Sequence, residues 1–303
     1  MAISQIGNII KSRRLELGLS QEVLSEGICS VTTLSRIENG ERMPTQNHLQ
    51  MLLQRLGYSE TMFHSYVDED AFYAHELKFK IRQAHIENRV DDGKALLEEF
   101  KALVKNPSNI DRQFILLNET LLSFSSGKCS ESLAKFEEAL RLTIPNYARG
   151  KLPQIMSYEE IVLLNCIANS LFDLGQRDDA ISILYSIVKY YDTLAVNPEE
   201  MLRTATMIFY NLSKYLGLEG RYDECIQICD RGIALAQKTG RANCFAPTLF
   251  NKGWVLIKRG RQEDRPEGIK FIHQAKNVAE ALGSRGLEKH IQNFIEENRL
   301  QEF

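Results

Sequence analysis

Residues 11–40 read KSRRLELGLSQEVLSEGICSVTTLSRIENG and hold two short helical patterns joined by a tight turn. A first helix ends at Gly18, and Ser20 then stands where its hydroxyl caps the next helix. After a turn, a further helix is predicted over residues 31–38, with Gly40 beyond its end. Two helices in this arrangement are typical of a helix-turn-helix, which lays its second helix in the major groove of DNA.

The N-terminal part is also predicted to contain a small apolar core. Leucines at positions 49, 52, 53 and 56 follow helical spacing and predict one more helix, from about residue 45 to residue 56. We expect a five-helix bundle over residues 1–66 as the first domain. The spacing of Arg14 and Glu38 favours an internal ion pair between two helices over a phosphate contact by Arg14.

The outward side of helix 31–38 carries the groups that would meet DNA. Because the first turn of a recognition helix reaches base edges, Val31 is placed to pack on a thymine methyl and Arg36 to reach guanine or phosphate. A merely solvated helix face is the competing interpretation of the small hydroxyl side chains. The predicted DNA-binding residues are Lys11, Arg13, Gln21, Ser30, Val31, Thr32, Thr33, Arg36 and Asn39.

The charge of this module is balanced. Residues 1–66 hold six Lys or Arg against six Asp or Glu, a sum of zero, and the whole chain has a net charge of −3. Bulk electrostatic attraction therefore does not hold the module on DNA. Affinity has to come from locally placed cations, helix N-termini and backbone amides, and from a second copy of the module. We expect a homodimer on a double-stranded DNA operator.

Enzymatic chemistry is not expected. The six histidines show no paired ligand spacing, the six cysteines form no CxxC pair, and no phosphate-binding glycine loop or serine elbow occurs. Cys225 and Cys229 are expected to be neighbouring core thiols rather than a metal or redox pair. No window approaches the roughly 18 apolar residues of a membrane span. We predict a cytoplasmic protein with no metal, cofactor or membrane partner.

Residues 67–303 carry amphipathic helices in pairs, and their turns share a pattern in which a glycine is followed five residues later by a small residue. The pattern occurs as Gly127 with Ser132, Gly175 with Ala180, Gly220 with Cys225, and Gly260 with three extra residues before Gly268. A degenerate first copy at 86–104 lacks the turn glycine. The repeats predict an all-α fold whose second domain is a right-handed superhelix of about five tetratricopeptide-like helix pairs and a C-terminal helix.

The first helices of such pairs line a concave face, and asparagines recur on them in register. A carboxamide both donates and accepts, so a ladder of asparagines can clasp the main chain of an extended peptide. A locally bonded polar residue is the simpler interpretation of any single one. The cations Lys78, Arg82 and Arg89 are candidates for a peptide carboxylate. The predicted peptide-binding residues are Asn118, Asn165, Asn169, Tyr210, Asn211, Lys214, Tyr215, Phe250, Asn251 and Trp254.

The segments KSRRLELGLSQ and LSRIENG resemble the phage-repressor, or XRE, type of helix-turn-helix. The shortened turn in EGICSVTTLSRIENG and the repeats NCIANSLFDLG and FYNLSKYLGLEGRYDE resemble the peptide-pheromone receptors grouped as RNPP, in particular their PlcR-like branch. The resemblance implies that Gln21 contacts phosphate, that the start of helix 31–38 reads bases, and that Asn169 and Asn211 hold a peptide backbone.

The expected function is a transcriptional regulator of quorum sensing, in which a short linear signalling peptide binds the repeats and changes the separation of two DNA modules. The linker near residues 58–75 would act as the hinge. One alternative is a ligand-independent regulator whose repeats serve as a scaffold for protein partners and dimerisation. A phosphatase that stimulates a response regulator is a second alternative, based on family analogy alone.

Overall fold

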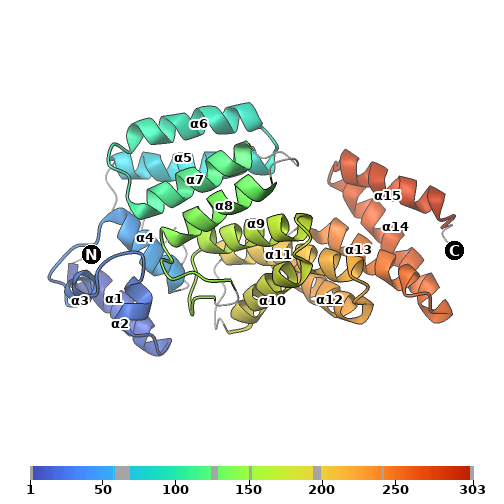
Figure 1. Cartoon of the computed structure of the whole chain (residues 1–303), viewed down its shortest axis with the longest axis horizontal. Coiled ribbons are helices and arrows are strands. Elements are labelled where there is room, and N and C mark those ends of the chain that lie inside the picture. The colour runs from blue at the N-terminus through green and yellow to red at the C-terminus, as the bar shows by residue number, and fades with distance from the viewer. Residues whose placement is uncertain are drawn as a thin grey trace. The chain divides into compact units, whose positions relative to one another are not determined.

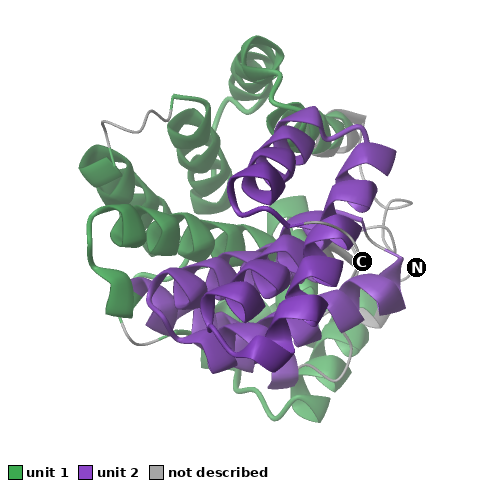
Figure 2. Ribbon diagram, turned by 90° about the vertical axis from the view of Figure 1, so that its right-hand side faces the viewer, with its two compact units in different colours: residues 1–179, 194–198 green, residues 180–193, 199–303 purple. Residues whose placement is uncertain are grey.

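The computed structural model describes residues 3–56, 58, 69–123, 129–149, 152–193, 199–240 and 242–300. Within these residues the chain is α-helical apart from turns, one 3-10 segment and a longer irregular stretch at 142–149 and 152–157 that holds an isolated bridge at Ala148 (Figure 1). The helices divide between two compact units, one of residues 1–179 with 194–198 and one of residues 180–193 with 199–303 (Figure 2).

Four helices form the N-terminal module. They are α1 (Ile3–Glu16), α2 (Gln21–Ser25), α3 (Val31–Glu38) and α4 (Gln46–Arg55). The expected starts of α2 and α4 are confirmed, since Ser20 caps α2 and Thr45 caps α4 through their side-chain oxygens. The expectation that the second helix continues to Ile28 was wrong, because α2 ends at Ser25. Any fifth helix of the expected bundle would fall on residues up to 66 that lie outside those described, as does most of the expected hinge.

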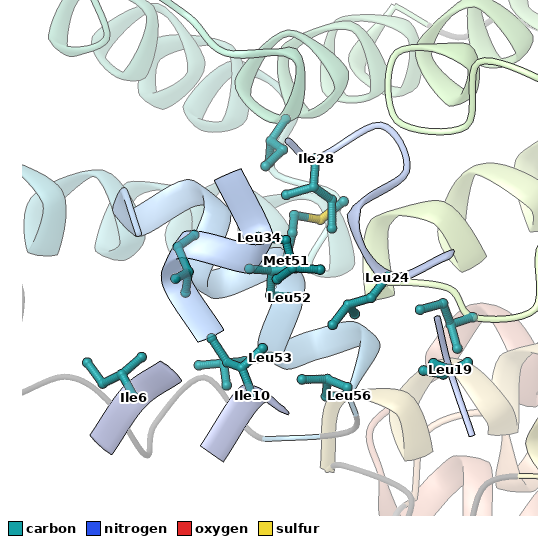
Figure 3. Packing of buried hydrophobic residues seen from close by; sticks show 13 residues of the cluster. Ile6, Ile10, Leu19, Leu24, Ile28, Leu34, Met51, Leu52, Leu53 and Leu56 are labelled. Atoms are coloured by element: carbon teal, nitrogen blue, oxygen red, sulfur yellow. The ribbon is translucent and has the colours of Figure 1, made fainter. Parts of the chain in front are cut away.

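The core of this module is a layer of aliphatic side chains from all four helices. Ile10, Leu24, Leu34 and Leu52 are fully buried at its centre (Figure 3). Amphipathic helices this short are marginal by themselves, so their burial against one another supplies most of the stability. The layer holds α3 against α1 and α2 and leaves the far side of α3 exposed.

The remaining helices follow along the chain in the order expected from the repeats, two to each repeat. They are α5 (Glu69–Ile86) and α6 (Val90–Leu103), α7 (Asn109–Leu122) and α8 (Cys129–Arg141), α9 (Tyr158–Asp173) and α10 (Arg177–Thr193), α11 (Glu199–Leu218) and α12 (Tyr222–Thr239), and α13 (Phe245–Lys258) and α14 (Arg265–Ala281). The C-terminal helix α15 (Arg285–Glu297) follows. The three-residue insertion forms the 3-10 segment Gln262–Asp264, directly before Arg265 and Pro266 begin α14.

The turn glycines have the conformation that their position requires. Gly175, Gly220 and Gly260 all have positive φ angles, between 73° and 81°. Gly127 lies outside the described residues. In the first pair, where the glycine is missing, Asn88 adopts φ 55° instead. Asparagine tolerates the left-handed region better than most residues, so the degenerate repeat keeps its turn without glycine.

Within the second unit, successive helices pack in order. Helix α11 contacts α12 and α13, α13 contacts α14, and α14 contacts α15. Helices α13 and α14 approach closely because two glycines face each other: a Cβ added to Gly253 would lie 2.7 Å from the carbonyl oxygen of Gly268. Helix α15 covers the last pair, with Ile291 and Leu300 buried in its core.

No helix among the described residues is long and apolar enough to cross a membrane. In the same residues, no group of three or more His, Cys, Asp or Glu side chains is arranged to hold a metal ion. Cys225 and Cys229 are buried with their sulfur atoms 4.0 Å apart, which confirms two neighbouring core thiols. The pKa of Cys225 is raised because its thiol shares a hydrogen bond with Cys229 and is desolvated.

Candidate nucleic-acid interface and candidate peptide site

Helix α3, which the sequence predicts to be the recognition helix, begins with a capped turn. The Ser30 hydroxyl accepts a hydrogen bond from the Thr33 backbone N–H at 3.1 Å and shares another with the Thr33 hydroxyl at 2.9 Å. Two of the predicted DNA-binding residues therefore help to form the helix end. Val31, Thr32 and Arg36 are exposed on the outer side, and the Arg36 guanidinium forms no hydrogen bond or ion pair with the described residues.

A buried ion pair fixes α3 to α1, as predicted from the spacing of Arg14 and Glu38. The Nε and Nη2 atoms of Arg14 donate to the two Glu38 carboxylate oxygens at 2.6 and 2.8 Å, and Nη1 donates to the Leu19 carbonyl. The hydrogen bond to Glu38 raises the pKa of Arg14. Such a bidentate pair fixes both side chains in one geometry.

Gln21 belongs to the same network. Its Nε2 atom donates to Glu38 at 2.7 Å, which leaves the second N–H of the carboxamide outside this bond. Gln21 is the first residue of α2 and is half-buried. Glu38 therefore orients the side chain of Gln21 as well as that of Arg14.

The two predicted phosphate-binding cations differ in their surroundings. Lys11 is exposed on α1 and forms no interaction with the described residues. Arg13 donates from Nε to the Leu56 carbonyl at 3.2 Å and from Nη1 to Glu16 at 3.0 Å. Asn39 is exposed and forms the C-terminal cap of α3. Lys11 is consequently the cation of α1 that is available to an external phosphate.

In the second unit, the predicted peptide-binding asparagines lie on two adjacent first helices, α11 and α13. Asn251 is buried, and its Nδ2 atom donates to the Tyr210 carbonyl at 3.3 Å and to the Ser213 hydroxyl at 2.9 Å. These bonds cross from α13 to α11 and hold the two helices together. Asn211, on α11, is also buried.

The predicted aromatic residues and Lys214 are distributed over the same two helices. Tyr215 is buried, whereas Tyr210 is half-buried and desolvation raises the pKa of its hydroxyl. Phe250 packs edge-on against Phe294 of α15, with ring centroids 5.3 Å apart. Trp254 is half-buried beside Gly217, and Lys214 is exposed. Phe250 thus contacts the C-terminal helix.

In the first unit, the predicted asparagines lie on α7 and α9. Asn118 is buried and donates to the Phe114 carbonyl one turn earlier, at 2.7 Å. This is the local bond that a single helical asparagine commonly makes. Asn165 is buried and Asn169 is half-buried one turn later on α9.

The three cations considered for a peptide carboxylate already have acidic partners. Lys78 is buried and lies 3.3 Å from a carboxylate oxygen of Asp111. Arg82 pairs with Glu159 at the start of α9. Arg89 is exposed and pairs with Glu87 and Asp92. The charges of all three are therefore compensated within the chain.

Sequence reasoning missed a polar cluster where α4 meets α7 and α9. Arg55 is 3% exposed, and one of its amino groups donates to the Glu160 carboxylate. Asn47 donates to Asp111 at the start of α7. The signal in the sequence was weak: Arg55 stands directly before Leu56 in a run of core residues, a place where an arginine is seldom buried without an acidic partner.

Two family models match the chain. The helix-turn-helix model matches residues 10–63, and the model of the RNPP family C-terminal domain matches residues 87–252, more than half of the chain. No curated protein matches the chain.

Several solved structures have a similar fold. Bacillus thuringiensis PlcR in complex with the peptide PapR7 and DNA is 20% identical, with a TM-score of 0.63 over 95% of this chain and 99% of that one. The apo form of the same protein is 19% identical, with a TM-score of 0.59 over 96% and 98%. The apo form of the competence regulator ComR from Streptococcus vestibularis is 18% identical, with a TM-score of 0.53 over 99% and 100%. At these identities, the likeness shows a shared fold.

Proposed function

The chain belongs to the RNPP family, and from this premise we propose that it is a sequence-specific DNA-binding regulator whose repeats bind a short signalling peptide. One observation carries the DNA-binding part. The outer side of α3 presents Val31, Thr32 and Arg36 to solvent, while the buried Arg14–Glu38 pair fixes the helix from behind. A recognition helix needs this combination of a rigid inner side and an open outer side.

We place the reading of bases on Val31, Thr32 and Arg36, and the positioning on phosphates on Lys11 and Gln21. Arg36 is long enough to contact a guanine edge, and Gln21 is oriented by Glu38 with one amide N–H remaining. Ser30, Thr33, Arg13 and Asn39 are assigned supporting roles, since the first three bond within the module and Asn39 ends α3.

The peptide part of the proposal rests on the family and on the asparagines of the first helices. The PlcR structure holds a peptide and DNA, and a ComR structure from Streptococcus vestibularis holds its cognate signalling peptide. Of the predicted set, we propose Asn169 and Asn211 as the main contacts to peptide backbone. This choice rests on the family resemblance of the segments NCIANSLFDLG and FYNLSKYLGLEGRYDE, which contain these two asparagines.

We further propose that the protein acts as a homodimer in the cytoplasm and is a regulator rather than an enzyme. Because residues 1–66 carry no net charge, one module has little non-specific affinity, and two modules on adjacent half-sites multiply their contacts. A peptide that favours the matching arrangement by about 1.4 kcal/mol would shift operator occupancy about tenfold.

The test is a selection of duplexes from a random library by the full-length protein, followed by titration of the enriched operator with and without peptides from a synthetic library. We expect a palindromic operator and at least one peptide that changes its affinity. Enrichment of no sequence would overturn the DNA-binding function, and binding of peptides without any change in operator affinity would overturn the regulation.

A ligand-independent scaffold is the second candidate, favoured by the internal hydrogen bonds of Asn118 and Asn251. It predicts that Asn169→Ala and Asn211→Ala leave every response of transcription unchanged. The peptide-binding function predicts instead that each substitution weakens peptide binding about tenfold, because a lost hydrogen bond to a main-chain group costs on the order of 1–1.5 kcal/mol.

A further inference from the structure

The last residue of α4, Arg55, is a buried cation. Arg55 donates from Nη2 to Glu160 Oε1 at 2.9 Å, and neither side chain is more than 2% exposed. From Nη1 it also donates to the carbonyls of Leu24 and Glu26, at 3.2 and 2.6 Å. One guanidinium therefore connects α4, the C-terminal end of α2 and the first turn of α9.

The carboxylate of Glu160 is also fixed by hydrogen bonds at the start of α9. Its second carboxylate oxygen accepts from the Ser157 backbone N–H at 2.6 Å, and the Ser157 hydroxyl accepts from the Glu160 N–H, which completes a capping box. The carboxylate that binds Arg55 is thus fixed by the start of α9 itself.

A second link lies beside the first. Asn47 of α4 donates to the Ser108 hydroxyl at 3.1 Å and to Asp111 Oδ2 at 2.7 Å. Asp111 caps α7 and also pairs with Lys78 of α5. Two helices of the repeats, α7 and α9, therefore bind side chains of α4, and Lys78 of α5 supports Asp111.

The backbone of the α2–α3 turn also touches the repeats directly. Gly27 has φ +70°, and a Cβ atom there would lie 1.6 Å from the Thr143 carbonyl oxygen. Only glycine allows this approach. Ile110 and Ile155, outside the DNA module, are buried in the same apolar cluster as its leucines.

These contacts do not involve the residues proposed to read bases. Val31, Thr32 and Arg36 take no part in them and stay exposed. The docked module therefore keeps α3 accessible to DNA. Docking on the repeats fixes the orientation of α3 and does not cover it.

We propose that Arg55 and Glu160 are positioning residues for operator recognition. They fix the DNA module on α7–α9, so that α3 moves with the first repeats as one body and the spacing of operator half-sites is set by the repeats. This inference rests on the proposed function. A DNA module tethered only by a flexible linker would instead accept half-sites at many separations.

The test compares Glu160→Gln with Glu159→Gln in the full-length protein. Glutamine can still cap α9, so Glu160→Gln mainly removes the charge opposite Arg55. Glu159 is the matched control because it is also a buried carboxylate in the first turn of α9, but it pairs with Arg82 of α5 and not with the DNA module.

Hydrogen exchange gives the first readout and requires no DNA. In Glu160→Gln we expect amides of residues 20–30 to exchange at least about fivefold faster than in the wild type, with α13 unchanged as the reference for global stability. Glu159→Gln should leave residues 20–30 as in the wild type. Equal exchange in the two variants at residues 20–30 would overturn the proposed link.

Operator spacing gives the second readout, with the selected palindrome and versions lengthened by one to five base pairs. The wild type and Glu159→Gln should bind one spacing with about tenfold higher affinity, or more, than the others. The affinity of Glu160→Gln for the different spacings should vary by no more than about threefold. Its affinity for a single half-site should equal that of the wild type. A retained spacing preference in Glu160→Gln would overturn the positioning role. A wild type that binds no operator would overturn the proposed function, while the exchange readout would still decide whether Glu160 holds the module.

Discussion

At the scale of single residues, the N-terminal module depends on charges removed from water. Arg14 and Glu38 are 7% and 1% exposed and bind each other through two hydrogen bonds. A buried pair of this kind adds little net stability over an apolar pair, but the loss of one partner leaves an uncompensated charge. The pair therefore specifies the packing of α3 on α1.

We predict that Arg14→Met lowers the free energy of unfolding of the module by about 3–5 kcal/mol, because Glu38 stays buried without its cation. The double variant Arg14→Met with Glu38→Leu should recover most of this loss. Urea denaturation followed by circular dichroism measures both. A double variant as unstable as the single one would show that the ion pair is not the cause.

A second residue-scale prediction concerns pH. Desolvation, and to a smaller extent Arg42, lowers the pKa of His48 below its ordinary value of 6.5. The unfolded chain therefore binds the proton more readily than the folded one, and the free energy of unfolding falls as the pH drops below about 6.5. The loss continues until the lowered pKa of the folded state is reached.

Replacing His48 by glutamine should make unfolding less sensitive to pH in that range. The difference in unfolding free energy between the wild type and His48→Gln should be constant above pH 7 and shift against the wild type between pH 6.5 and 5. Denaturation at four pH values checks this, and parallel curves for the two proteins would contradict it.

At the scale of elements, the described turns between paired helices need a residue with a positive φ angle, and either glycine or asparagine supplies it. Three of them use glycine with positive φ, and the turn between α5 and α6 uses Asn88. The repeats stay equivalent in backbone although the sequence signal differs, because what the turn requires is a left-handed residue.

We predict that Asn88→Val destabilises the first unit by about 1–3 kcal/mol, since a β-branched residue is strained at φ 55°. Asn88→Gly should stay within about 1 kcal/mol of the wild type. Thermal unfolding distinguishes the two. Equal losses in both variants would instead assign the role of Asn88 to its side chain.

At the scale of the whole molecule, charge balance governs how the protein meets DNA. The DNA module is neutral, and of its two predicted phosphate-binding cations Lys11 has no side-chain partner among the described residues, while Arg13 bonds to Leu56 and Glu16. Few counterions are therefore released on binding, and the salt dependence of affinity should be shallow for a DNA-binding protein.

We predict that Lys11→Ala reduces the slope of log affinity against log salt by about 1 for each module bound, with affinity for all operators reduced alike. Lys94→Ala is the control, because Lys94 is an exposed lysine on α6 of the repeats. Titration of the selected operator at several salt concentrations measures the slopes, and an unchanged slope in Lys11→Ala would remove this residue from the interface.

The sequence by itself determined the parts that depend on neighbours along the chain. Helix caps, turn residues and apolar periodicity act over a few residues, which is why α2 and α3 begin at the positions expected and the paired helices follow the glycines. The Arg14–Glu38 pair also followed from spacing, since both lie in one short motif.

Only the tertiary structure decided which polar side chains are used internally. Asn251 donates across to α11, Lys78 is buried beside Asp111, and Arg55 meets Glu160 from 105 residues away. Partners so far apart leave no periodic signal, because a hydrogen bond depends on distance in space and direction rather than on separation along the chain. The docking of the DNA module on the repeats is therefore a property of the folded molecule.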